Sequence, residues 1–132
     1  MIRLAVAAAL VAVHPLPALR TPSGNISCFV AHATLHCKLA RADYAPAMTK
    51  RCGPPIGLDW AGFALGVRGP ARVECTGGVL YNPATERPAY RTLSYGRSRR
   101  LGGFTCDSER IGLTCRRTSH GLFISRETWR LW

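Results

Sequence analysis

The sequence is poor in negative charge and in lysine. It carries 7 Asp and Glu residues against 18 Lys and Arg, which gives a formal net charge of +11, and Lys38 and Lys50 are its only lysines. Carboxylates this few and scattered do not provide the pair of acids that glycoside hydrolysis requires. The positive charge favours anionic partners such as nucleic acid, phosphate-bearing wall polymers or acidic membrane surfaces. Because most of it is arginine in a chain rich in Ala and Gly, the composition of a GC-rich genome also accounts for it.

Several signatures of site chemistry are also missing. The six cysteines include no Cys-x-x-Cys pair, and hence none with a His-x3–5-His pair next to it, which argues against a zinc site. Ser119 and His120 are adjacent, but no Gly-x-Ser-x-Gly turn supports a nucleophilic triad. Asp59 and Trp60 are better interpreted as a turn cap and a core anchor than as a catalytic acid and its neighbour. We therefore expect no metal and no cofactor.

The first twenty residues have the pattern of a targeting segment. Arg3 precedes an unbroken apolar run from Leu4 to Val13, which Pro15 and Pro17 follow. The run is too short to span a bilayer and is typical of a secretory signal peptide. The sequence predicts a signal peptide over residues 1–18 with cleavage near Ala18, then a single domain over 19–132 that is secreted or extracytoplasmic.

The cysteines occur in a repeated module. ISCFVAHATLHCK (26–38) and FTCDSERIGLTCR (104–116) each carry two cysteines nine positions apart, preceded by Ser or Thr and followed by a basic residue. An even cysteine count in an exported chain predicts disulfides. In a hairpin, opposed cysteines lie at bonding distance, and the apolar residues share the cysteine face. We expect hairpins, the second with a four-residue loop from Glu109 to Gly112, and three disulfides: Cys28–Cys37, Cys106–Cys115 and, by elimination, Cys52–Cys75.

A helix over 26–42 is the alternative for the first module, because this stretch lacks Gly and Pro. Cys28, His32 and His36 would then line one helix face and suit a metal. The second module contains Gly112 and Thr-rich flanks, which suit a hairpin better. In a hairpin, His36 lies on the face opposite the cysteines, and disulfide-bonded cysteines do not bind metal.

The remaining segments predict short strands separated by turns. We expect the following organisation: a hairpin of 57–67 with 71–77, a loop over 82–88, strand-forming residues over 90–95, an Arg- and Gly-rich connection over 96–103, and a final strand over 121–132. This pattern is typical of an all-β domain, here a small disulfide-stapled antiparallel sheet structure, either a sandwich or a partly open barrel.

An arginine cluster is the best candidate for a binding site. Its members are Tyr95, Arg97, Arg99, Arg100, Arg116 and Arg117. Guanidinium groups bind phosphate and carboxylate through two hydrogen bonds, and a tyrosine can stack on a ring. The plainer interpretation is a solvated loop whose charge keeps the protein soluble.

Two functions from different classes fit these features. The leading hypothesis is a non-enzymatic exported binding or inhibitor-like module, whose partner is an anionic polymer or an envelope protein. The alternative is a secreted basic ribonuclease-type hydrolase with His36 and His120 as base and acid and Lys38 steadying the phosphate.

Six stretches of the chain together resemble a known family. They are TPSGNISC (21–28), LHC (35–37), Asp59-Trp60, SYGRS (94–98), GGFTC…GLTC (102–115) and HGLFISRE (120–127). The family consists of small exported disulfide-containing bacterial proteins with a TPSGNI-x-C signature and is catalogued as a domain of unknown function. The resemblance implies export, disulfides and a single domain. It implies no activity and no catalytic residue.

Overall fold

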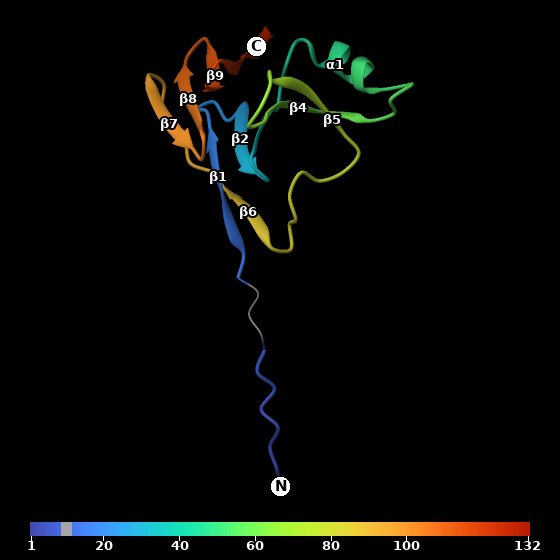
Figure 1. Cartoon of the computed structure of the whole chain (residues 1–132), viewed down its shortest axis with the longest axis vertical. Coiled ribbons are helices and arrows are strands. Elements are labelled where there is room, and N and C mark those ends of the chain that lie inside the picture. Colours follow the sequence, from blue (N-terminus) through green and yellow to red (C-terminus); the bar gives the residue numbers. More distant parts are fainter. Residues whose placement is uncertain (9–11) are drawn as a thin grey trace.

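Two β-sheets packed against each other make up most of the protein, which we describe from a computed structural model covering residues 1–8 and 12–132 (Figure 1). The first sheet contains β1 (His14–Arg20), β2 (Ile26–Ala31), β3 (Thr34–Leu39), β4 (Asp59–Leu65), β5 (Arg72–Thr76) and β6 (Glu86–Ala89), in the order β5-β4-β3-β2-β1-β6. The second contains β7 (Arg97–Leu101), β8 (Phe104–Glu109), β9 (Gly112–Arg117), β10 (His120–Ile124) and β11 (Trp129–Leu131), in the order β11-β10-β9-β8-β7. The prediction of a small disulfide-stapled all-β domain is confirmed, and the sheets form a sandwich.

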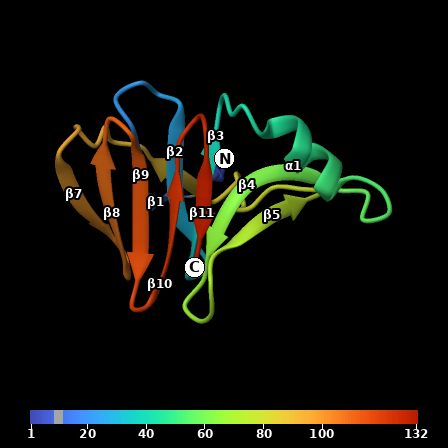
Figure 2. The same ribbon diagram turned by 90° about the horizontal axis from the view of Figure 1, so that it is seen from above.

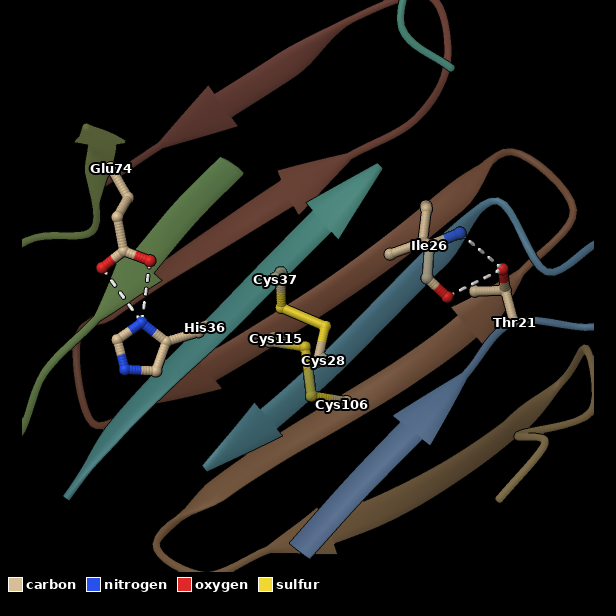
Figure 3. Close-up of a disulfide and its surroundings, with 8 residues drawn as sticks. All are labelled: Thr21, Ile26, Cys28, His36, Cys37, Glu74, Cys106 and Cys115. Carbon is tan, nitrogen blue, oxygen red and sulfur yellow. Dashed lines mark hydrogen bonds and ion pairs between the residues drawn. A yellow bond between two sulfur atoms is a disulfide. The ribbon is translucent and has the colours of Figure 1, made fainter. Parts of the chain in front are cut away.

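The two cysteine modules are hairpins, as predicted. Cys28 lies opposite Cys37 in the β2–β3 hairpin, and Cys106 lies opposite Cys115 in the β8–β9 hairpin. Each pair is disulfide-bonded with a Cα–Cα distance of 4.1 Å. Figure 3 shows the two disulfides facing each other between the sheets, and the Sγ atoms of Cys28, Cys37 and Cys115 all lie within 4.8 Å of one another. Each disulfide therefore links two strands of one sheet, and the two disulfides pack against each other at the centre of the core.

The turns of the two hairpins differ. The first turn places His32 and Ala33 at positive φ (51° and 59°), as two-residue hairpin turns with the twist of the strands require. In the second hairpin Glu109 still pairs with Gly112, so the predicted four-residue loop is wrong and only residues 110–111 turn. A Cβ on Gly112 would lie 2.6 Å from the carbonyl oxygen of Ile124. The glycine thus allows β10 to approach closely.

The third disulfide, Cys52–Cys75, confirms the pairing reached by elimination. It joins β5 to the helix α1 (Ala45–Cys52), which the sequence analysis did not predict. Pro46 lies in the first turn of this helix, where the missing N–H costs nothing. Met48 and Cys52, four positions apart, are its buried residues, so one face of the short helix packs inward.

Three segments were assigned incorrectly. The residues over 90–95, expected to form a strand, make only an isolated parallel bridge between Thr92 and Arg20. The expected loop over 82–88 contains most of β6, which pairs in parallel with β1, and the expected connection over 96–103 contains β7. Both are edge strands rich in charge or proline, features that protect a sheet edge from further pairing but obscure a strand pattern. The expected final strand is two strands, β10 and β11, joined by a turn over residues 125–128.

The N-terminal strand β1 begins inside the expected targeting segment. Leu16, Ala18 and Leu19 are each 4% exposed or less. Leu19 faces the core between the sheets, whereas Leu16 and Ala18 pack with Phe29 on the outer side of the first sheet. Ala18, the predicted cleavage position, therefore lies within a paired strand; the cleavage itself stays a prediction.

The main core combines aliphatic and aromatic residues of both sheets. Its largest fully buried side chains are those of Phe63 and Phe104. Trp60 packs against Phe63 with ring centroids 5.8 Å apart and donates its indole N–H to the Gly62 carbonyl at 2.9 Å. This confirms Trp60 as a core anchor. Within the part of the chain that the structure describes, no helix is long and apolar enough to cross a membrane.

Candidate functional site

The outer side of the second sheet carries arginines in a regular row. Cys106 and Cys115 face the core, so the residues next to them face outward. The strand register places Arg100, Thr105 and Arg116 side by side on neighbouring strands β7, β8 and β9. In Figure 2, strands β8, β9 and β10 lie in front of β1 and β2, and no other labelled element crosses them. Arg100 and Arg116 are exposed and Thr105 is partly exposed, so the row is open to solvent.

Aromatic rings continue this surface toward the C-terminus. The indole of Trp132 lies over Gly121, where an added Cβ would come within 2.7 Å of the ring atom Cζ2. The Arg130 guanidinium lies 5.3 Å from the centre of the same ring. Arg130 also lies opposite Phe123 on β10, which is partly exposed. We call the surface formed by Arg100, Arg116, Phe123, Arg130 and Trp132 the basic face.

Two of the three arginines on the basic face have no acidic partner in the described part of the chain. Arg116 forms an ion pair with Asp107, which also accepts a hydrogen bond from Ser98. Arg100 and Arg130 make no ion pair with any residue in the described ranges. The face therefore combines two free guanidinium groups, one paired guanidinium and two exposed aromatic surfaces.

Of the six residues predicted to bind, the structure brings Arg100 and Arg116 together on the basic face. Arg99 points to the other side of β7 and donates to the carbonyl oxygens of Arg91 at 3.2 Å and Thr92 at 3.3 Å. These bonds fasten the edge of the second sheet to the chain that follows β6. Because residues 97–101 form a strand rather than a loop, alternation sends neighbouring arginines to opposite sides.

The other three predicted residues are dispersed. The Arg117 guanidinium carbon lies 5.5 Å from the centre of the buried Phe104 ring, so this side chain packs on the core side of the second sheet. Tyr95 contacts Arg110 at the tip of the β8–β9 hairpin, 5.1 Å from guanidinium carbon to ring centre. Arg97 is exposed at the start of β7.

Arg130, Phe123 and Trp132 were missed by the sequence analysis. Alternation within 121–132 was visible, but it was interpreted as one continuous strand. The polar stretch Ser125–Thr128 was the available signal for a turn, and Ser125 N–H bonds to the Thr128 carbonyl oxygen at 2.9 Å there. Folding back at this turn brings Arg130 and Trp132 beside β10.

A cavity of about 530 Å³ lies near the 21–25 turn. It is lined by residues of several stretches that carry the family resemblance: Thr21, Ser23, Gly24, Asn25, Tyr95, Ser125, Arg126 and Glu127. Arg41 and Arg110 add positive charge, and Glu109 adds negative charge. Arg126 forms an ion pair with Asp43, in which Nε lies 3.4 Å from Oδ1. The cavity therefore carries charges of both signs and favours neither a simple anion nor a simple cation.

The residues of the alternative hydrolase do not form one site. His36 lies on the side of the first sheet that faces away from the second sheet, and its Nδ1 is 2.8 and 3.0 Å from the two carboxylate oxygens of Glu74 (Figure 3). Lys38 shares that side, two residues further along β3. His120 lies on β10 beside Arg117, on the core side of the second sheet, and the first sheet separates it from His36.

The structure also places the residues of the metal site considered for Cys28, His32 and His36. Cys28, Cys37 and Cys115 form the one described group close enough to hold an ion, and all three are disulfide-bonded, so their sulfurs do not ligate a metal as thiolates. His32 lies at the exposed hairpin turn, with Nε2 3.7 Å from the Glu86 carboxylate.

Comparison with known proteins adds no assignment, because no protein-family model, no curated protein and no solved structure matches the chain. The family resemblance based on TPSGNISC and its companion motifs stays a prediction. Function must therefore be inferred from the surfaces just described.

Proposed function

We propose that the protein is an exported, non-enzymatic binding module that holds an anionic polymer of the cell envelope on its basic face. The observation that carries this proposal is the grouping of three arginines with Phe123 and Trp132 on an uncovered sheet surface. Guanidinium groups bind phosphate or carboxylate groups along such a polymer. The aromatic rings offer flat apolar surfaces for the sugar or polyol backbone between the charges.

The geometry of the sheet suits an extended partner. Arg100 and Arg116 lie two strands apart, about 10 Å at the usual strand spacing. A flexible polymer can place successive charged groups near Arg100 and Arg116 in turn. Three disulfides in a domain of this size are typical of an oxidising compartment outside the cytoplasm, which supports action at the envelope.

A charge-matched pair of variants tests the proposal. Arg100→Gln/Arg116→Gln/Arg130→Gln removes three charges from the basic face. The control, Arg51→Gln/Arg68→Gln/Arg87→Gln, removes three exposed charges elsewhere. Both are titrated with heparin and with purified poly(glycerol phosphate) at several salt concentrations.

We expect the basic-face variant to lose about tenfold or more in affinity and the control to change less than about threefold. The slope of log K against log salt should decrease in magnitude by about two to three in the basic-face variant, because each of the three lost phosphate contacts removes about 0.7–0.9 of a released counterion. Equal losses in both variants would show that net charge alone drives binding and would reject the basic face as a site.

The hydrolase alternative has less support. Catalysis on one phosphate requires both histidines within hydrogen-bond reach of the reacting atoms. His36 and His120 lie on different sheets with the first sheet between them.

A further inference from the structure

A second row of polar residues crosses the outer side of the first sheet. The register places Arg20 on β1 opposite Ser27 on β2, and Ser27 opposite Lys38 on β3. Leu19, Cys28 and Cys37, the neighbours of these three residues, face the core. Arg20, Ser27 and Lys38 therefore share the outward side, two positive charges with a hydroxyl between them.

This row lines a cavity. Its volume is about 230 Å³, and it is lined by Arg20, Gly24, Ser27, Lys38 and Tyr90. The Arg20 guanidinium lies 5.4 Å from the centre of the Tyr90 ring, so the tyrosine forms a wall and orients the guanidinium. No carboxylate lines the cavity in the described structure.

The two cations are not neutralised by neighbouring side chains. Neither Arg20 nor Lys38 takes part in an ion pair within residues 1–8 and 12–132. The acid nearest along the row is Glu74, which is separated from Lys38 by Gly62 on β4. Both carboxylate oxygens of Glu74 contact the His36 ring instead. His36 thus holds Glu74 away from Lys38.

We propose that this cavity binds a phosphate group, with Arg20 and Lys38 supplying the charge and the hydroxyls of Ser27 and Tyr90 supplying neutral hydrogen bonds. A guanidinium fork and an ammonium group are the usual protein partners of phosphate oxygens. The cavity is larger than a single water site, so it has room for part of the alcohol to which the phosphate is esterified.

The state of Tyr90 agrees with this role. Burial, followed by the neighbouring Tyr81 phenol, raises the pKa of Tyr90 above 10.0, and Ser27 and Arg20 lower it by less. The hydroxyl therefore stays protonated at neutral pH and can donate a hydrogen bond to a phosphate oxygen.

The site is separate from the basic face, because the two rows lie on the outer sides of opposite sheets. It also differs in kind. The basic face is an open surface that suits a polymer, whereas the Arg20–Lys38 cavity is a recess that suits one phosphate group or a chain end.

Amide chemical shifts of the oxidised full-length chain test the inference. The probes are inorganic phosphate, glycerol 3-phosphate, a nucleoside monophosphate, and glycerol as the uncharged control. We expect saturable shifts at Arg20, Ser27 and Lys38 with all three phosphates and none with glycerol. A tighter fit of glycerol 3-phosphate than of the nucleotide would assign the site to polyol phosphates, and the reverse order would assign it to nucleotides.

Matched variants separate local recognition from net charge. Arg20→Gln/Lys38→Gln should weaken phosphate binding by about tenfold or more, Ser27→Ala by a few fold, and the control Arg68→Gln/Arg87→Gln by less than twofold. The basic-face triple variant should keep phosphate binding, so failure of either site is seen independently. Shifts that do not saturate, or an equal loss in the control, would overturn the proposal.

Discussion

Removing residues 14–18, the first five of the seven residues of β1, should destabilise the fold, although the sequence pattern predicts cleavage near Ala18. The comparison is between chains that start at His14 and at Leu19. β1 lies between β2 and β6, and Leu16 and Ala18 are both 4% exposed in a small cluster with Phe29. A chain starting at Leu19 keeps the core contact of Leu19 but loses both outer side chains.

The size of the effect follows from the buried groups. Burying a leucine side chain is worth about 1.5–3 kcal/mol, and the single methyl of alanine about 0.8 kcal/mol. The loss of Leu16 and Ala18 therefore costs about 2–4 kcal/mol. β6 also loses its partner, because it pairs with no other strand in the described part of the chain. Since a domain of this size has a total stability of about 5–15 kcal/mol, this is a large fraction.

The assay is thermal unfolding of the oxidised proteins. At about 4 °C per kcal/mol for a chain of this length, the chain from Leu19 should melt about 8–16 °C below the chain from His14. The chain from His14 should melt like the full-length protein, because residues 1–8, 12 and 13 are exposed. The intact mass of the protein recovered from the culture medium should correspondingly place its N-terminus at or before His14.

Equal melting temperatures for the chains from His14 and Leu19 would refute this reasoning. Residues 14–18 of β1 would then contribute nothing to the stability of the fold, and cleavage near Ala18 would be compatible with a stable product. A secreted protein that starts at Leu19 and melts at the full-length temperature would be the clearest form of that result.

Three further predictions concern single side chains. Gly121→Ala should destabilise the protein by about 1–3 kcal/mol and displace Trp132, measured by urea unfolding and by the shift of tryptophan fluorescence. Glu74→Ala should cost about 1–3 kcal/mol because it leaves Nδ1 of the buried His36 without a partner, and Glu74→Gln should recover part of this loss in the same assay. Burial, with nearby acids, raises the pKa of Tyr44 from 10.0 to about 12. The neutral phenol is thus favoured in the folded state, so stability should fall as pH rises from about 10 to 12, and Tyr44→Phe should flatten this fall in the urea midpoint.

The features that could be predicted from the sequence are local ones. The hairpins and their disulfides follow from the nine-residue cysteine spacing, because directly opposed residues in a hairpin are fixed by the chain between them. The outward orientation of Ser27, Lys38, Thr105 and Arg116 follows from the same alternation and is confirmed by the register. Both the hairpins and the side-chain orientations depend only on contacts within one hairpin.

The features that could not be predicted depend on distant partners. β6 is a strand because β1 lies beside it, and Pro88 hides this in the sequence. β7 carries three arginines in five residues and is a strand because its backbone pairs with that of β8. The candidate sites have the same limit, since Tyr90 reaches Arg20, and Trp132 reaches Gly121, only when strands from separate parts of the sequence pair.

The two cysteine modules also resemble each other on their outer sides. Arg20, Ser27 and Lys38 cross the first sheet as cation, hydroxyl and cation, and Arg100, Thr105 and Arg116 cross the second in the same arrangement. The repeat therefore sets both the disulfides and the polar rows behind them. One outward position next to the first cysteine distinguishes the copies: it is Phe29 in the first module and Asp107 in the second.

This difference explains why a phosphate site is expected on the first sheet alone. Asp107 forms an ion pair with Arg116, whereas Phe29 leaves Lys38 free. Asp107→Asn should release Arg116 and raise the affinity of the basic face for poly(glycerol phosphate) by about threefold to tenfold, because one charge-assisted contact becomes available. Glycerol 3-phosphate should then also shift the amides of Thr105 and Arg116. Unchanged affinity in this variant, with the fold intact by its melting temperature, would mean that Asp107 does not limit the second row.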